Sequence, residues 1–128
     1  MTVPITALYA GILGLLLTAL AINVTVHRAK LKVTIGDGGN PQMQRMIRLH
    51  GNAAEYVPLG LILMGLYELD GGLHPALHAA GTALIVGRVL HIWGMWGTAE
   101  PNFGRAAGPT LTWLAIAVMA VLNLWQIG

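Results

Sequence analysis

The 128-residue sequence has no cysteine and few charged side chains. Without cysteine it forms no disulfide framework, offers no thiolate to a metal, and lacks a cysteine nucleophile. Charged residues are only 9% of the chain, against roughly 25% in an average soluble domain, while hydrophobic residues are 55%. A small fold exposes much of its surface, and so few charges cannot cover it. The composition excludes an ordinary soluble globule and a disordered chain.

The basic residues are also too few and too scattered for a nucleic-acid binder. The formal net charge is only +2, and no groove-sized basic face is evident. The remaining class is an integral membrane protein. Residues 1–26 and 106–128 contain no charged side chain, and each stretch exceeds the roughly 20 apolar residues that cross a bilayer.

Between these two stretches lie two less uniform apolar segments, separated by loops rich in glycine, proline and asparagine. We therefore expect one all-α domain over residues 1–128, an integral membrane four-helix bundle. The helices are predicted near residues 4–27, 43–68, 75–97 and 107–127.

The loop charges predict an orientation in the membrane. The first loop and its flanks are rich in lysine and arginine, the second carries Glu68 and Asp70 without a base, and the third carries Arg105. Because basic loops stay in the cytoplasm, loops one and three are predicted to be cytoplasmic and both termini periplasmic.

Polar residues inside the predicted spans are the most informative part of the chain. Arg48, Asn52 and Glu55 are spaced four and three apart and so share one helix face, and Arg88 and His91 are three apart on the next helix. At about 1.5 Å per residue, these groups lie roughly 8–18 Å from the cytoplasmic ends of their helices. A charge at such depth must be paired or face a cavity. We expect a Glu55–Arg88 ion pair beside a polar cavity.

In this interpretation Arg48, Asn52 and His91 line the cavity, and Arg105 at the foot of the last helix reaches its mouth. An arginine-rich cavity suits a small anionic or zwitterionic ligand from the cytoplasm, with an apolar partner arriving from the bilayer. The alternatives are structural. The same charges fit a network that clamps the helices together, Arg48 fits a snorkelling arginine, and His91 fits a packing histidine. The scattered histidines predict no metal site.

Residues 48–58 read RLHGNAAEYVP, and this R-x-x-x-N-x-x-E-Y-x-P pattern resembles the signature of the MAPEG family, the membrane-associated proteins of eicosanoid and glutathione metabolism. Residues 87–91, GRVLH, resemble a second family block. The V-x-x-G-D-G-G loop at residues 33–39 resembles the uncharacterised bacterial inner-membrane branch.

The resemblance implies a homotrimer in the inner membrane, with glutathione bound between neighbouring subunits on the cytoplasmic side. It places glutathione on Arg48, Asn52, Glu55, Tyr56, Arg88 and His91. It also implies that Arg105, the nearest match to a family arginine that activates the thiol, has a catalytic role. Many catalytic members carry a tyrosine where this chain has Met95.

Three functions follow as hypotheses. The first is a glutathione transferase or peroxidase acting on lipophilic electrophiles or hydroperoxides. The second, suggested by Met95, is a non-catalytic membrane ligand-binding or scaffold protein. The third, a small multidrug exporter, is disfavoured because such exporters need an acid in the first helix and this chain has none there.

Overall fold

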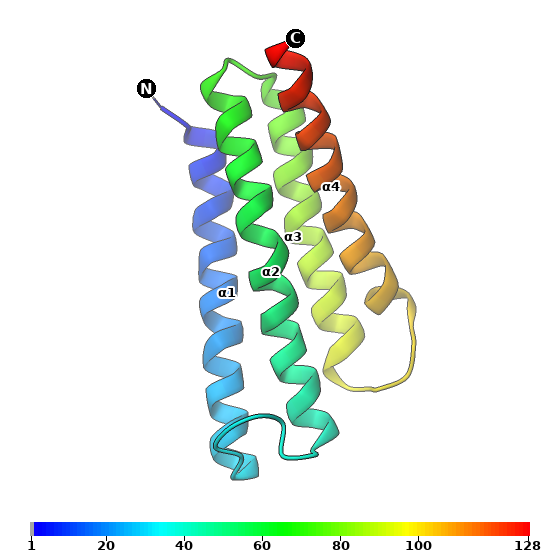
Figure 1. The fold of residues 1–128 in the computed structure, drawn as a ribbon. Helices are drawn as coiled ribbons and strands as arrows, with labels where there is room; N and C mark the ends of the chain where they lie inside the picture. Colours follow the sequence, from blue (N-terminus) through cyan, green and yellow to red (C-terminus); the bar gives the residue numbers. More distant parts are fainter. Residues whose placement is uncertain (1) are drawn as a thin grey trace.

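Four helices run side by side, each antiparallel to the next in the chain (Figure 1). The computed structural model describes residues 2–128 and contains α1 (Pro4–Leu31), α2 (Pro41–Leu69), α3 (His74–Trp96) and α4 (Phe103–Ile127). The two chain ends lie at the same end of the bundle as the α2–α3 turn, and the other two loops lie at the opposite end (Figure 1). This arrangement agrees with the all-α, four-helix expectation.

Capping residues explain where the helices begin and end. The Asn40 side chain accepts hydrogen bonds from the backbone of Gln42 and Met43, which caps α2. The Asn102 side chain does the same for α4 by accepting from the Arg105 backbone, so α4 begins at Phe103 rather than near residue 107. The first helix runs to Leu31, beyond the predicted residue 27, and ends at Lys32 in the left-handed conformation.

The outer surface and the helix lengths fit a membrane protein. Three of the described helices, α1, α3 and α4, are long and apolar enough to cross a bilayer. The second helix carries Arg45, Arg48 and Glu55 and falls outside that group. It nevertheless packs against α1, α3 and α4 along the bundle (Figure 1). Its charged side chains therefore lie at the same depth in the membrane as the apolar residues of these helices.

Glycines bring α3 and α4 into backbone contact in the half of the bundle near their connecting loop. A Cβ added at Gly87 would lie 2.7 Å from Thr112 Oγ1 and 2.8 Å from the Gly108 carbonyl oxygen. A Cβ at Gly94 would overlap the backbone at Gly104 and Arg105. Small residues allow such approach in lipid, where hydrophobicity does not drive helix association. This contact sets the height and rotation of α4 against the polar residues of α3.

Candidate functional site

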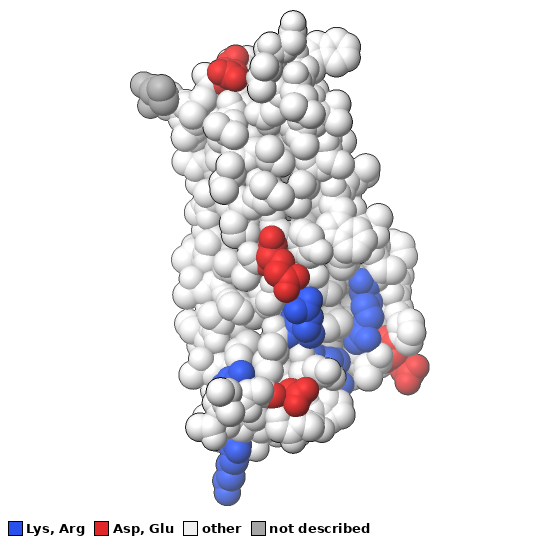
Figure 2. Space-filling view, in the orientation of Figure 1, with Lys and Arg blue, Asp and Glu red and all other residues white. Residues whose placement is uncertain are grey.

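An ion pair lies on the outside of the isolated subunit. Arg48 Nη1 is 3.1 Å from Glu55 Oε1, and the side chains are 51% and 50% exposed. The pair passes over Gly51, where an added Cβ would lie 3.4 Å from Arg48 Nη1. Figure 2 shows a basic and an acidic side chain in contact on this face, with largely uncharged surface beyond them toward the chain termini. By the helix rise, the two charges lie about 10 and 21 Å from the start of α2, within the apolar layer.

A second polar group is buried between three helices. Arg88 on α3 is only 1% exposed. Its Nη1 donates to Asn52 Oδ1 on α2, and its Nη2 donates to Thr112 Oγ1 on α4 at 2.7 Å. Its Nε has no partner among the described residues. One buried guanidinium thus joins α2, α3 and α4 through neutral side chains.

The predicted Glu55–Arg88 ion pair is therefore wrong. Glu55 pairs within its own helix with Arg48, while Arg88 turns to Asn52 and Thr112. A depth argument places residues in one layer but does not give the rotation of each helix about its axis. That rotation carries Glu55 to the exposed side of α2 and leaves Asn52 closer to α3.

A pocket of about 250 Å³ opens at the end of the bundle that carries the α1–α2 and α3–α4 loops, near the Arg48–Glu55 ion pair. Its lining includes three arginines, Arg45, Arg48 and Arg105, together with Met95. Arg105 is fixed there because its Nη1 and Nη2 donate to the Ala99 and Thr98 carbonyls, each at 2.7 Å. The Nε atoms of Arg45 and Arg105 are buried and have no partner in residues 2–128. No acidic side chain lines this pocket.

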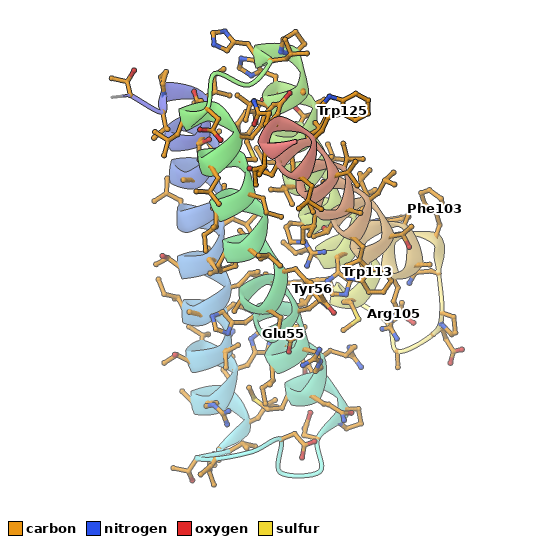
Figure 3. The ribbon with its side chains drawn as sticks, turned by 45° about the horizontal axis from the view of Figure 1, so that its top comes forward. Glu55, Tyr56, Phe103, Arg105, Trp113 and Trp125 are labelled. Atoms are coloured by element: carbon orange, nitrogen blue, oxygen red, sulfur yellow. The ribbon has the colours of Figure 1, made fainter. Side chains whose placement is uncertain are left out.

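Two aromatic rings lie on the same side of the molecule as the pocket and the ion pair, within the apolar layer. The Tyr56 and Trp113 rings, from α2 and α4, lie 6.0 Å apart edge to face. Figure 3 places Glu55, Tyr56, Trp113 and Arg105 on one side of the bundle, where α2 and α4 border the same space. Trp113 is 50% exposed, so one aromatic surface remains free beside the charged groups.

The predicted residues thus divide into two sets. Arg48 and Arg105 line the pocket, and Glu55 and Tyr56 lie on the same side. Arg88 and His91 are buried, with His91 6% exposed and packed against the backbone at Gly108. Asn52 is half-buried and connects the two sets through Arg88.

Sequence reasoning missed Thr112 and Arg45. Thr112 lies in the part of α4 after Arg105, which carries no charge, and only its position opposite Arg88 reveals it. Arg45 lies one turn before Arg48, and that spacing predicts that both side chains lie on one face of the helix. Among residues 2–128, no three histidine or acidic side chains gather as a metal site.

Comparison with known proteins confirms the family resemblance that the motif at residues 48–58 indicates. The sequence model of the MAPEG family matches residues 6–125. The chain is 35% identical to the inner membrane protein YecN of Escherichia coli K12, over 94% of this chain and 91% of that protein. It is also 32% identical to the uncharacterized protein sll1147 of Synechocystis, over 94% of this chain and 89% of that one.

Proposed function

The chain belongs to the MAPEG family, an integral membrane family that includes glutathione transferases, and on that premise we propose that it binds glutathione and either joins it through its sulfur to lipophilic electrophiles or uses it to reduce lipophilic hydroperoxides. The site consists of the arginine-lined pocket, the Arg48–Glu55 pair and the aromatic surface beside them.

This proposal rests on an excess of positive charge in one half of the bundle. Four arginines of the site, Arg45, Arg48, Arg88 and Arg105, lie in the half of the bundle near the two longer loops, and Glu55 is the only acidic residue of the four described helices in that half. Four cations and one anion leave three positive charges without compensation at the site. In a layer of low polarity such an excess requires an anionic ligand or water. Glutathione with an ionised thiol carries a net charge of two negatives and so offsets most of the excess.

The arrangement suggests how the tripeptide is held. Its carboxylates bind the guanidinium groups of Arg45 and Arg48, because arginine binds carboxylates through paired hydrogen bonds. Its ammonium group binds Glu55, which exchanges part of its contact with Arg48 for the ligand. Tyr56 borders this position and offers a hydroxyl group. Arg88 is too enclosed to touch a large ligand and acts through its field and through Asn52.

The thiol is activated by the same excess of charge. A nearby cation favours the thiolate over the thiol, and Arg105 is held at the pocket by two backbone carbonyls. The thiolate sulfur then attacks an electrophilic carbon, forms a C–S bond and expels the leaving group. With a hydroperoxide, two glutathione molecules give the disulfide while the peroxide becomes an alcohol and water. The lipophilic partner enters from the bilayer along Tyr56 and Trp113.

A second copy of the chain completes the site in this proposal. An ion pair that is half exposed to hydrocarbon is unfavourable, so another subunit or an enclosed ligand must cover it. The first helix has a matching uncovered strip of small residues. Gly11 and Gly14 have no neighbour within 4 Å of an added Cβ. A cyclic assembly that places this strip of one subunit over α2 of the next covers both faces, and a homotrimer is the form that the family resemblance implies.

We also propose that the protein lies in the inner membrane, the location named for the relative YecN. The two longer loops carry or flank most of the bases, so they face the cytoplasm, and the termini face the periplasm. The pocket then opens to the compartment that supplies glutathione.

Calorimetry on the detergent-purified protein tests binding directly. Wild-type protein is expected to bind glutathione, and Arg48→Gln is expected to weaken binding about tenfold or more, because a charge-assisted hydrogen bond contributes roughly 1.5–3 kcal/mol. Lys30→Gln is the matched control, since it removes an exposed base outside the pocket. Wild-type protein that binds no glutathione at millimolar concentration contradicts the proposal.

A non-catalytic binding protein is the second candidate, and Met95 favours it. This thioether lines the pocket and cannot donate a hydrogen bond to a thiolate. Turnover of chlorodinitrobenzene or cumene hydroperoxide separates the two candidates. Glutathione-dependent turnover that Arg105→Gln abolishes supports the transferase or peroxidase, whereas tight binding without turnover supports the binding protein.

A further inference from the structure

A second cavity, of about 370 Å³, lies beside the α3–α4 loop and shares no lining residue with the arginine-lined pocket. Its lining, the tryptophan cradle, consists of Trp93, Trp96, Gly97, Thr98 and Asn102. Both indole rings come from the last turns of α3 and are largely exposed, at 66% and 52%. None of the five side chains is charged, so the cradle suits a ligand different from that of the arginine-lined pocket.

The cradle lies where α3 leaves the apolar layer. Val86 and Val89 precede Trp93 by seven and four residues, so these three exposed side chains form one apolar face of α3 that leads to the cradle. Tryptophan collects at membrane interfaces because its ring is apolar and its indole N–H is polar. A molecule with its polar part in the cradle and apolar chains along this face has the form of a membrane lipid.

The free polar atoms of the cradle are hydrogen-bond donors. The indole N–H groups of Trp93 and Trp96 donate to no other residue in the range 2–128. Thr98 Oγ1 accepts from the Glu100 backbone nitrogen at 3.0 Å, which leaves the hydroxyl proton for another acceptor. The Asn102 amide is already used, since its Nδ2 donates to the Gly94 carbonyl at 2.7 Å. Three donors near one another suit the oxygens of a phosphodiester.

Glu100 gives the edge of the cradle a negative charge. Its backbone nitrogen bonds to Thr98, and its carbonyl accepts from Asn102 Nδ2 at 3.3 Å, so it is attached to two residues of the lining. The exposed carboxylate forms no ion pair with any residue in the described part of the chain. A carboxylate attracts an ammonium group and repels an anion, and indole faces also attract cations. A headgroup that carries an ammonium group beside its phosphate therefore fits better than an anionic one.

We propose that the tryptophan cradle binds the headgroup of a zwitterionic aminophospholipid from the surrounding bilayer. The phosphate accepts hydrogen bonds from the two indole N–H groups and the Thr98 hydroxyl, while the ammonium group lies at Glu100. The acyl chains run along Val86 and Val89. This lipid site goes beyond the proposed function and requires no glutathione.

The cradle and Arg105 are joined through two shared residues. The Thr98 carbonyl accepts from Arg105 Nη2 at 2.7 Å, and Asn102 Oδ1 accepts from the Arg105 backbone nitrogen at 3.1 Å. Both residues also line the cradle. A bound headgroup therefore restrains the segment that fixes Arg105 at the arginine-lined pocket. Only the effect of this restraint on thiol activation rests on the proposed function.

Native mass spectrometry of the detergent-purified protein, with equal amounts of dioleoyl phosphatidylethanolamine and dioleoyl phosphatidylglycerol added, tests the lipid site. Wild-type protein is expected to retain phosphatidylethanolamine. Trp93→Leu and Trp96→Leu are each expected to weaken retention about tenfold, because each removes a donor to a charged group. Trp125→Leu is the matched control, since this exposed tryptophan lies at the opposite end of the bundle (Figure 3). Equal retention by all three variants overturns the proposal.

Glu100→Gln tests the ammonium position. The variant is expected to retain phospholipid but to lose the preference for phosphatidylethanolamine over phosphatidylglycerol, whereas Asp70→Asn, an exposed acid at the other end of the bundle, is expected to keep it. A wild-type preference for phosphatidylglycerol, or a preference that survives Glu100→Gln, overturns the assignment. Free phosphoethanolamine at the same concentration is expected not to displace the lipid. Displacement would identify a soluble ligand and overturn the lipid site.

Hydrogen exchange tests the link between the cradle and Arg105. Backbone exchange in residues 97–102 is expected to be slower in nanodiscs of phosphatidylethanolamine and phosphatidylcholine than in phosphatidylcholine alone, and Trp93→Leu is expected to remove the difference. Equal exchange in the two bilayers overturns the restraint. None of these measurements contains glutathione. A wild-type protein that binds the lipid but not glutathione contradicts the proposed function alone, and one that binds glutathione but shows no lipid preference contradicts this inference alone.

Discussion

The Glu68 carboxylate, one residue before the end of α2, caps the N-terminus of α1 at Ile5. Glu68 Oε1 accepts from the Ile5 backbone nitrogen at 2.9 Å, and Oε2 accepts from the next nitrogen, that of Thr6, at 2.8 Å. The first helix has no capping side chain of its own at Val3 and no acid in its first turn. A residue more than 60 positions away thus satisfies donors that a local serine or aspartate usually satisfies.

Replacing Glu68 is expected to destabilise the bundle without touching the candidate site. Glu68→Gln removes the charge that favours a helix N-terminus, and Glu68→Ala removes both acceptors, at a loss of about 1–2 kcal/mol in the free energy of unfolding. Thermal or denaturant unfolding in detergent measures the change. Asp70→Asn, an exposed acid in the adjacent turn, is the control and is expected to have no effect. Equal stability of Glu68→Ala and wild type contradicts this role.

Gly94→Ala is expected to push α4 away from α3. The added methyl group would overlap the backbone at Gly104 and Arg105, and overpacking of this kind costs roughly 1–3 kcal/mol. Because Arg105 lies at the same contact, glutathione binding is expected to weaken as well. Gly97→Ala is the matched control, since an added Cβ there has no neighbour within 4 Å. If both variants behave alike in unfolding and calorimetry, the contact is not tight.

Exchanging Arg48 and Glu55 separates the ion pair from the ligand site. Arg48→Glu or Glu55→Arg alone places two like charges within reach in the apolar layer, and each is expected to lower the yield of folded protein. The double variant restores the pair and is expected to recover folding, measured by size-exclusion profile and melting temperature. It reverses the polarity offered to glutathione, so binding is expected to stay lost. Recovery of binding in the double variant would show that the pair has only a structural function.

Met95→Tyr tests whether a missing donor limits catalysis. Met95 lines the pocket with Arg48 and Arg105, and a tyrosine hydroxyl there would donate to a thiolate. Glutathione-dependent turnover is expected to rise about tenfold or more, in line with the contribution of one donor to a developing anion. Met95→Leu, which changes shape but adds no donor, is the control. A Met95→Tyr protein that binds glutathione without faster turnover contradicts the idea.

Much of the candidate site was predictable because its signals are local. The spacing of Arg48, Asn52 and Glu55 on one helix follows from the helical repeat, and the depth of Arg88 follows from its distance to the helix end. The partners of these residues were not predictable. Glu55 bonds to Arg48 and not to Arg88, because partner choice depends on how each helix is rotated against its neighbours.

The amino-acid sequence was enough to predict the class of protein, the number of helices and the layer in which the polar residues lie. Each of these follows from composition and from periodicity along a single segment. Three contacts became evident only in the folded molecule: Thr112 meets Arg88, Arg45 joins Arg105 in one pocket, and Glu68 caps α1. These contacts depend on close glycine packing between helices and on side-chain directions across large sequence separations. No local pattern carries that information, since it arises only when the helices are packed together.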